Sequence, residues 1–204
     1  MTIDIFADIA CPWCYVGEHR LAEALRRTGV EAELRWWPFQ LQPDIPAEGL
    51  PWEPFAKAKF GGMDRARAAY GHLEQAAGDA IRFDFDNLAS APNTTDAHRL
   101  MLLAQTQQRI PEMAESLFAG YFTEGRNLND IDTLVHLAER AGFPGEGVRA
   151  FLASDDGKGE VEHSQQVAQQ YGIQGVPFYI IAGERPLSGA QPVEAFEAAL
   201  VRFA

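Results

Sequence analysis

The two cysteines of this 204-residue chain stand two residues apart, in the segment Cys11-Pro12-Trp13-Cys14. A short apolar segment precedes them, and a helical pattern that runs to about Thr28 follows. A helix N-terminus stabilises negative charge, and the thiolate is the reactive form of cysteine. The spacing and the position of the pair therefore predict a dithiol that exchanges with other disulfides.

The helical spacing also predicts unequal roles for the two thiols. Pro12 suits the first position of a helix, where its missing N–H costs nothing, and this places Cys11 at the helix mouth, facing solvent. Cys14 falls on the same helical stripe as Leu21 and Leu25, so we expect it to point towards the core. Cys11 is then the attacking thiol and Cys14 the resolving thiol.

Three other interpretations of the cysteine pair stay open at this point. A structural disulfide normally closes a longer loop, because its benefit comes from constraining the unfolded chain. A zinc site usually has four ligands, and the chain has no second cysteine pair and no histidines at a shared spacing, so no metal is expected. Two buried, inert thiols are the third alternative. A C-x-x-C pair next to a strand–helix unit favours the redox interpretation.

Composition and charge narrow the class of protein. The chain has 17 Lys and Arg against 29 Asp and Glu, a formal net charge of −12, and no basic run stands out. Nucleic acid is therefore not an expected partner, because binding it needs a basic surface. We see no membrane-spanning segment and no secretory signal, so we expect a cytoplasmic protein that does not interact with membranes. A reducing compartment in turn favours catalytic over structural cysteines.

The order of the predicted elements indicates an α/β fold with inserted helices. Alternation of apolar residues predicts strands, and apolar residues at helical spacing predict helices. Along the chain the predicted elements are strand 2–8, helix 12–28, strand 31–39, helices 52–60 and 64–77, helices beginning near 93, 111 and 130, helix 158–171, strands 175–182 and 185–188, and helix 192–203.

Without its middle helices, the order β-α-β … α-β-β-α is that of the thioredoxin fold. We therefore predict a thioredoxin-like domain made of residues 1–44 and 156–204. Residues 45–155 are predicted to form a large inserted all-helical subdomain. The sequence leaves both a monomer and a homodimer that forms through this insert open.

A second candidate site lies at Val176-Pro177, at the start of the strand predicted at 175–182. In the thioredoxin arrangement this position lies beside the N-terminus of the first helix. We expect Pro177 to be cis, a conformation that proteins use in tight turns. Since proline has no N–H, the backbone of Val176 is left free to pair with an extended substrate. An ordinary trans proline at a strand start is the alternative.

Four further residues are weaker candidates. Pro12 and Trp13, between the cysteines, are expected to contact substrate, with Trp13 exposed. Asp8 is a candidate proton acceptor for Cys14, and the alternative is a solvated carboxylate at the strand end. His98 is a candidate cleft residue contributed by the insert, and the alternative is a histidine bonded to a neighbour.

Together these segments resemble the DsbA-like branch of the thioredoxin superfamily, in particular the FrnE-type oxidoreductases. The resemblance implies thiol–disulfide exchange at Cys11 and Cys14 that reduces, oxidises or exchanges disulfides in protein, peptide or small-thiol substrates. Some FrnE-type members carry a second cysteine pair, which this chain lacks, so a second redox site is excluded. The matching segments follow the family order over nearly the whole chain: CPWCYVG at 11–17, PFQLQP at 38–43, NTTDAHRL at 93–100, GVPF at 175–178 and SGAQP at 188–192.

The chain also resembles a neighbouring branch, the 2-hydroxychromene-2-carboxylate isomerases and kappa-class glutathione transferases. These usually carry serine at the position of Cys11 and activate the thiol of glutathione. A glutathione-dependent isomerase or transferase is therefore the alternative function, and a non-enzymatic binding module is a third. Val176 would bind the cysteinyl part of glutathione, and Gln191 would hold a carboxylate at the N-terminus of the last helix. No bound cofactor is expected beyond the redox-active disulfide, with glutathione as a candidate co-substrate.

Overall fold

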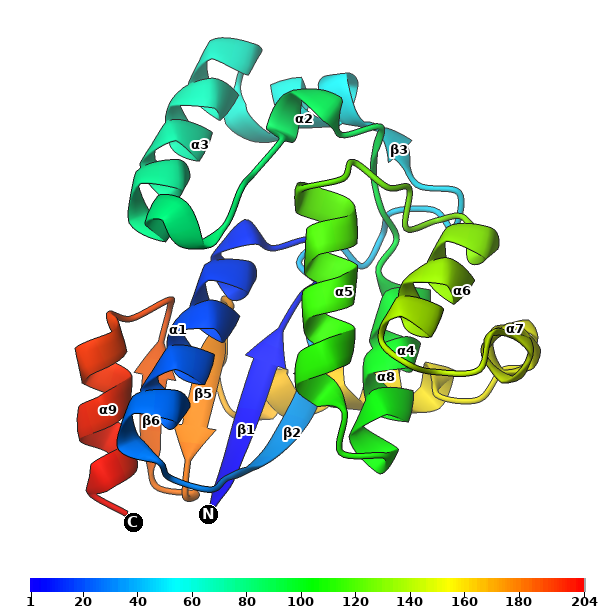
Figure 1. Cartoon of the computed structure of the whole chain (residues 1–204). Helices are drawn as coiled ribbons and strands as arrows, with labels where there is room; N and C mark the ends of the chain where they lie inside the picture. Colours follow the sequence, from blue (N-terminus) through cyan, green and yellow to red (C-terminus); the bar gives the residue numbers. More distant parts are fainter. Residues whose placement is uncertain (204) are drawn as a thin grey trace.

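The computed structural model of the chain describes residues 1–203, so Ala204, the end of the predicted segment 156–204, lies outside the described residues. The main sheet has the strand order β2-β1-β5-β6 (Figure 1). β1 pairs in parallel with β2 and antiparallel with β5, and β5 pairs antiparallel with β6. The strand bounds are β1 Thr2–Ala7, β2 Glu33–Pro38, β5 Phe178–Ile181 and β6 Arg185–Ser188.

The central strand β1 leads directly to the cysteine segment. Ile3 and Ile5 are fully buried, and Asp4 between them accepts a hydrogen bond from the indole N–H of Trp37 on β2 at 2.8 Å. Ala7 is the last residue of β1 that pairs with β2. The residues that follow it therefore lie at the carboxyl ends of two parallel strands, the edge at which α/β sheets generally bind ligands.

Helices cover both faces of this sheet. On one face α1 (Pro12–Thr28) packs against α9 (Val193–Val201), and α8 (Lys158–Gln170) lies behind β2 on the other (Figure 1). α1 ends at Gly29, whose φ of +65° lets its N–H reach the carbonyl of Leu25 at 2.9 Å. Glycine is the residue that adopts this conformation at least cost, as the sequence predicted for this helix end.

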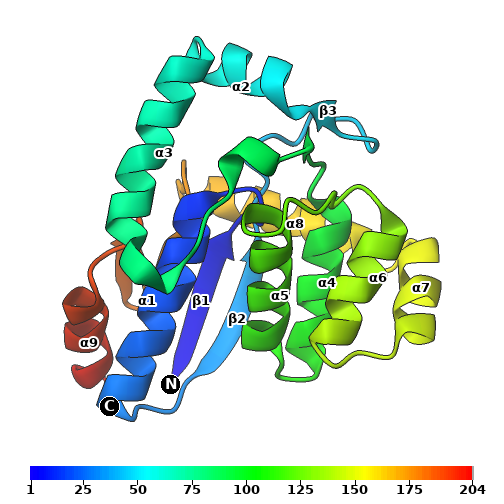
Figure 2. The same cartoon turned by 45° about the horizontal axis from the view of Figure 1, so that its top comes forward.

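A row of helices extends the molecule beyond β2 (Figure 2). The predicted cap at Asp130 is confirmed, since its side chain accepts a hydrogen bond from the Thr133 N–H at 3.0 Å. The fourth helix of the row is not predicted from the sequence, because it is short and Gly145 and Gly147 stand in its first turn. The row consists of α4 (Thr95–Thr106), α5 (Ile110–Phe122), α6 (Ile131–Arg140) and α7 (Gly145–Ala153).

The remaining helices form an arch above the end of the sheet at which β1 ends (Figures 1 and 2). Two short antiparallel strands close the base of the arch, where the Trp52 N–H also donates to the Ala89 carbonyl at 3.3 Å. At the C-terminal end of α3, the Ala76 carbonyl accepts a hydrogen bond from the Arg20 side chain of α1 at 2.7 Å, which connects the arch to α1. The arch consists of β3 (Leu50–Pro51), α2 (Trp52–Phe60), α3 (Met63–Ala77), the 3-10 turns η1 (Gly78–Ala80) and η2 (Phe85–Asn87), and β4 (Ser90–Ala91).

The inserted helices share a core with the sheet. α4 and α5 pack against β2, and α1 packs against α5, so one apolar cluster runs through both parts. The predicted α/β class with a large insertion between β2 and α8 is confirmed by the order of the elements. The insertion is mostly helical but not all-helical as predicted, because the short strands β3 and β4 pair within it. The division of the chain at residues 45 and 155 stays a prediction.

Candidate active site

Cys11 is the N-cap residue of α1, and Pro12 is its first helical residue. The Cys11 backbone is extended (φ −102°, ψ 109°), and its carbonyl accepts the N–H of Cys14 at 2.9 Å. The side chain makes no capping hydrogen bond, and its thiol donates to the carbonyl oxygen of Val176 across 3.6 Å. The first turn carries no acidic residue. The positive end of the helix dipole therefore acts on the Cys11 sulfur without a competing carboxylate from that turn.

Cys11 does not face solvent, and this expectation from the sequence is wrong. Only 5 % of the residue is exposed, because the loop before β5 places Val176 against its sulfur. Trp13 is the exposed side chain of the motif, as expected, with 40 % of its surface accessible. Contact between Trp13 and a substrate stays a prediction.

Cys14 lies one turn deeper, in the apolar core with Leu21, as predicted. Burial, and after it the neighbouring Cys11 sulfur, raises the pKa of the Cys14 thiol well above its ordinary value, and the charge of Asp8 acts in the same direction. Both cysteines are free thiols in the structure. This environment therefore favours the neutral thiol form of Cys14 over the thiolate.

The Val176–Pro177 peptide bond is cis. Strand β5 begins only at Phe178, so the predicted strand 175–182 is longer than the observed one, because the residues before Phe178 form the loop at Cys11. The Pro177 carbonyl accepts the Gly189 N–H at 2.8 Å, which brings the loop before α9 beside it. Within residues 1–203 the Val176 N–H makes no hydrogen bond.

Asp8 is buried, with 1 % of its surface exposed, so the alternative of a solvated carboxylate is wrong. Its Oδ2 accepts the Leu41 N–H at 2.8 Å, and its Oδ1 accepts the Ala10 N–H at 3.2 Å. These two bonds fix the carboxylate beneath the active-site turn, near enough to Cys14 for its charge to raise the pKa of that thiol. The role of Asp8 as the proton acceptor stays a prediction.

His98 is completely buried on α4 and does not face a cleft, so that prediction is wrong and the alternative of a bonded histidine is right. Its Nδ1 accepts the indole N–H of Trp36 at 3.2 Å. A neutral ring that accepts at Nδ1 carries its proton on Nε2. This Nε2 lies 3.4 Å from Asp8 Oδ1 and has no hydrogen-bond partner among the described residues. No local sequence pattern reveals the contact, because the two residues are far apart in the chain.

Gln191 lies in the loop before α9, whose N-cap residue is Pro192. Its side-chain Nε2 donates to the Ser188 carbonyl at 2.7 Å, so the amide is bonded within its own loop. Among the described residues, Gln191 makes no hydrogen bond with Cys11 or Cys14. A role of Gln191 in holding a ligand carboxylate stays a prediction.

Two residues near the cysteines are not identified from the sequence, Tyr179 of β5 and Glu18 of α1. Tyr179 is fully buried, and its hydroxyl approaches Gly17 so closely that a Cβ there would collide with it. Glu18 is buried too, and burial, with a smaller contribution from the charge of Glu115, raises its pKa to about 7. Gly17 stands inside a helical pattern, and such a glycine indicates a close contact of the kind seen here with Tyr179.

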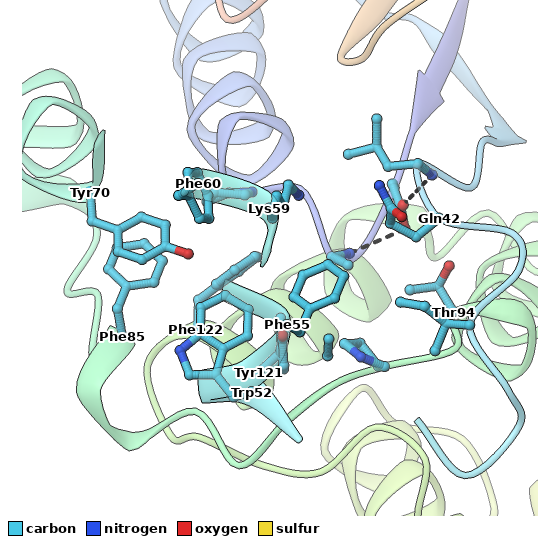
Figure 3. Close-up of a pocket in the computed structure, with 17 residues that line it drawn as sticks. Gln42, Trp52, Phe55, Lys59, Phe60, Tyr70, Phe85, Thr94, Tyr121 and Phe122 are labelled. Atoms are coloured by element: carbon cyan, nitrogen blue, oxygen red, sulfur yellow. Dashed lines mark hydrogen bonds between the residues drawn. The ribbon is translucent and has the colours of Figure 1, made fainter. Parts of the chain in front are cut away.

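A pocket lies beside the active-site turn, between it and the arch (Figure 3). Asp8, Ala10 and Pro12 line it on one side, so Pro12 faces this pocket as well as starting the helix. Most of the remaining wall is apolar, and the space amounts to about 560 Å³ including its open mouth. The sequence does not reveal this pocket, because its walls come from segments spread over more than a hundred residues.

In residues 1–203, His, Cys, Asp and Glu side chains form no group of three or more that could hold a metal ion. In the same part of the chain, no helix has both the length and the apolar character that crossing a bilayer requires.

Comparisons with known proteins agree with this geometry. The family model described as DSBA-like thioredoxin domain matches residues 2–201. The crystal structure of a probable DsbA oxidoreductase from Streptomyces coelicolor is 35% identical in sequence, with a TM-score of 0.87 over 99% of this chain and 89% of that chain. The Bacillus subtilis protein YwbO is 27% identical over 202 residues, which are 97% of this chain and 94% of that protein.

A more distant structure shows the same fold. The cytosolic disulfide reductase DsbM from Pseudomonas aeruginosa, solved with glutathione, has a TM-score of 0.69 at 19% identity, covering 99% of this chain and 98% of that chain. The sheet, the cysteine-bearing helix and the inserted helices are thus those of a thioredoxin-like fold of the DsbA type. By the family match over residues 2–201 and the similarity to the Streptomyces protein, the chain belongs to the DSBA-like thioredoxin domain family.

Proposed function

We propose that this chain is a thiol–disulfide oxidoreductase of the FrnE type that works through Cys11 and Cys14. One observation carries the proposal: the Cys11 sulfur sits at the N-terminus of α1, 3.6 Å from the carbonyl oxygen of Val176. A substrate that pairs with the backbone of Val176 would hold its own sulfur next to this thiol. The family supports the class of chemistry, and the cysteine pair supports these two residues as its carriers.

The reductive direction has two steps. The Cys11 thiolate attacks one sulfur of a substrate disulfide, the substrate S–S bond breaks, and the other sulfur leaves as a thiolate. Cys14 then loses its proton and attacks the Cys11 sulfur of the mixed disulfide, which releases the second substrate thiolate. The substrate gains two electrons, and the enzyme dithiol becomes a disulfide. The same steps in reverse oxidise a substrate dithiol.

We propose proteins, peptides or small molecules that carry a disulfide or thiol as substrates, with no bound cofactor and glutathione as a co-substrate. Glutathione has a cysteinyl backbone that suits the unpaired N–H of Val176, and the fold is shared with a reductase solved with glutathione. Trp13 and Pro12 would contact the substrate, and Gln191 would lie at the glycyl or glutamyl end of glutathione. We also propose a cytoplasmic location.

The test is a pair of cysteine variants assayed for reduction of insulin or of glutathione disulfide by a dithiol. Cys11→Ser is expected to abolish turnover, because no sulfur remains to attack the substrate. Cys14→Ser is expected to lose turnover while it accumulates a mixed disulfide at Cys11, detected by mass spectrometry under non-reducing conditions. Full activity of Cys11→Ser would overturn the proposal. A Cys14→Ser variant with undiminished turnover would favour the glutathione-dependent isomerase or transferase instead.

A further inference from the structure

The pocket between the active-site turn and the arch, called the aromatic pocket here, borders the backbone of the reacting thiol. Ala10 and Pro12, the two neighbours of Cys11, both line it. Consecutive Cα atoms lie about 3.8 Å apart, so the pocket begins within one residue of Cys11. Cys11 itself does not line the pocket, and its sulfur lies against the carbonyl oxygen of Val176. The pocket is therefore next to the reacting residue, and the substituent of a sulfur bound to Cys11 would have to bend past Pro12 or Ala10 to enter it.

The wall of the aromatic pocket offers ring faces that are already fixed in place. Seven of its 17 lining residues are aromatic. The rings of Tyr70 and Phe85 stack at 3.9 Å with an angle of 11° between them, and Phe85 in turn meets Phe122 of α5 edge-on at 6.0 Å. Figure 3 shows this pair on one side of the pocket, Gln42 on the other, and Phe55 between them. Tyr70 and Phe85 thus stack with each other, and Phe85 also stacks with Phe83 at 5.0 Å. Phe55 stacks with no ring of the described residues, so it is the ring of this wall that is left to contact a planar group.

The shape of the aromatic pocket favours a ring over an extended chain. Its walls come from the active-site turn, the loop after β2, both helices of the arch, the loop after β4, and α5. Walls on so many sides leave a small, partly enclosed space, which suits a compact group. An extended peptide would need an open groove along its whole length.

One cation lies among the residues that line the aromatic pocket. The ammonium of Lys59 sits 5.5 Å from the ring centre of Phe55 and 5.7 Å from that of Phe60. No carboxylate of the described residues lies within 4 Å of it, whereas Lys57 on the same helix pairs with Glu53 at 2.6 Å. The pocket's one acid, Asp8, is occupied by two backbone N–H groups. In a chain with a net charge of −12, a cation kept here favours an anionic substituent on the bound ring.

From these observations we propose that the aromatic pocket binds the ring of a small aromatic disulfide that carries an acidic group, and presents its sulfur to Cys11. This inference rests on the proposed oxidoreductase function and names a substrate class for it. The Cys11 thiolate forms a disulfide with the sulfur on the pocket-bound ring, and the other aromatic thiolate leaves. Cys14 then displaces the bound ring as a second thiolate, and the enzyme pair carries the disulfide. A dithiol reductant restores the enzyme for the next turnover.

The experiment uses four disulfides that vary ring and charge independently. They are 5,5′-dithiobis(2-nitrobenzoate), aromatic and acidic; 4,4′-dithiodipyridine, aromatic and neutral; 3,3′-dithiodipropionate, aliphatic and acidic; and bis(2-hydroxyethyl) disulfide, aliphatic and neutral. Fully reduced protein is mixed with each disulfide without added reductant, and the second-order rate of thiol loss is measured. Each variant is compared with the unaltered protein on the same disulfide, so the intrinsic reactivity of the disulfide cancels.

Phe55→Ala is expected to lower the rates with both aromatic disulfides by roughly threefold to tenfold, which is the effect of losing one contact between aromatic rings. The rates with the two aliphatic disulfides should stay unchanged. Phe55→Leu keeps apolar volume without the ring face, and it should show the same selective loss if the alanine variant folds poorly. Tyr171→Ala, which removes an exposed ring outside the pocket, is the matched control and should change none of the rates.

Lys59→Gln is expected to lower the rate with the acidic aromatic disulfide by roughly twofold to fivefold relative to the neutral aromatic one. A loss of this size is typical of removing one solvent-exposed ion pair. Lys57→Gln on the same helix is its control. Equal losses with all four disulfides, or none with any of them, would overturn the pocket as a substrate site. A different outcome would contradict the oxidoreductase function itself: the unaltered protein would reduce none of the four disulfides, and its rate of thiol loss would equal that of Cys11→Ser. This outcome is distinguishable from a failure of the pocket alone.

Discussion

The Nε2 atom of His98 lies 3.4 Å from Oδ1 of Asp8, while Nδ1 of the same ring accepts the indole N–H of Trp36. All three side chains are buried, with at most 2 % of any residue exposed. They join β2, α4 and the end of β1 directly beneath the turn that carries Cys11. The contact places an inserted helix against the carboxylate of Asp8, and the Nε2 atom makes no hydrogen bond with any described residue. Since an unpaired buried polar group is costly, the packing at this point depends on the bond from Trp36 to the other ring nitrogen.

Replacing His98 tests the link to Trp36. His98→Leu is expected to lower the free energy of unfolding by about 1–3 kcal/mol, because it leaves a buried indole N–H without an acceptor. Urea unfolding followed by far-UV circular dichroism measures the change. His136→Leu, on the exposed face of α6, should stay within about 0.5 kcal/mol of the unaltered protein. Identical unfolding midpoints for the two variants would contradict the buried contact.

Replacing Asp8 tests its predicted role as proton acceptor for Cys14. Asp8→Asn is expected to leave the attack of Cys11 on a disulfide largely unchanged and to slow release of the substrate from the mixed disulfide. A loss of roughly 100-fold or more in the second step is the scale of general base catalysis. Rapid-quench mass spectrometry separates the two steps. A variant that resolves the mixed disulfide at the normal rate would show that another group takes the proton.

The raised pKa of Cys14 predicts slow alkylation. In the Cys11→Ser variant burial remains, and burial is the largest cause of the shift. The rate of reaction with iodoacetamide should therefore keep rising with pH beyond about 8.5, the ordinary pKa of cysteine, and reach no plateau near that pH. The same variant unfolded in urea is the control, and its rate should level off there. A plateau near pH 8.5 in the folded protein would mean that Cys14 is not shielded.

Glu18 predicts a defined pH dependence of stability. Its pKa is about 7 in the folded chain against about 4.3 unfolded, because burial disfavours the charged form. Between these values the folded state binds more protons than the unfolded state, so the contribution of Glu18 is full below about pH 4.3 and is lost as pH rises through 7. The total is roughly 4 kcal/mol, for a difference of about 2.7 pKa units at about 1.36 kcal/mol for each unit.

The Glu18→Gln variant exposes this contribution. Its stability relative to the unaltered protein is expected to increase from pH 4.5 to pH 8 by up to roughly 3 kcal/mol, since glutamine carries no charge to bury. Urea midpoints at the two pH values give the difference. Glu162→Gln, at an exposed position of α8, should show a much smaller change. If the Glu18→Gln difference were constant with pH, the carboxyl group would have to be solvated.

Two helical glycines predict opposite effects of the same substitution. Gly17→Ala would drive a Cβ into the hydroxyl of Tyr179, whose ring cannot move away because it packs edge-on against Phe196 at 5.0 Å. A loss of about 1–3 kcal/mol is expected from such overpacking. Gly71→Ala in α3 meets no atom within 4 Å and should gain about 0.5–1 kcal/mol in helix stability. Thermal unfolding of the two variants measures both, and a stable Gly17→Ala would contradict the close contact.

Local patterns in the sequence determined the elements and the chemistry of this protein. The cysteine spacing, Pro12 at the helix start and Gly29 at its end define α1 from neighbouring residues alone, and β6 and α2 begin and end where their patterns do. The β-α-β unit was also predicted from local patterns, because hydrophobic periodicity and helix caps each depend on only a few neighbouring residues. The pair Cys11 and Cys14 was identified for the same reason.

The tertiary structure decided what those residues face, because contacts between distant segments leave no local pattern. The burial of Cys11 depends on Val176, more than 160 positions away, and the burial of Asp8 depends on the Leu41 N–H and on His98. The aromatic pocket exists only because the arch folds back over the active-site turn. The sequence by itself thus determined which atoms can react, and only the packing of remote segments decided their exposure, their charge environment and the space beside them.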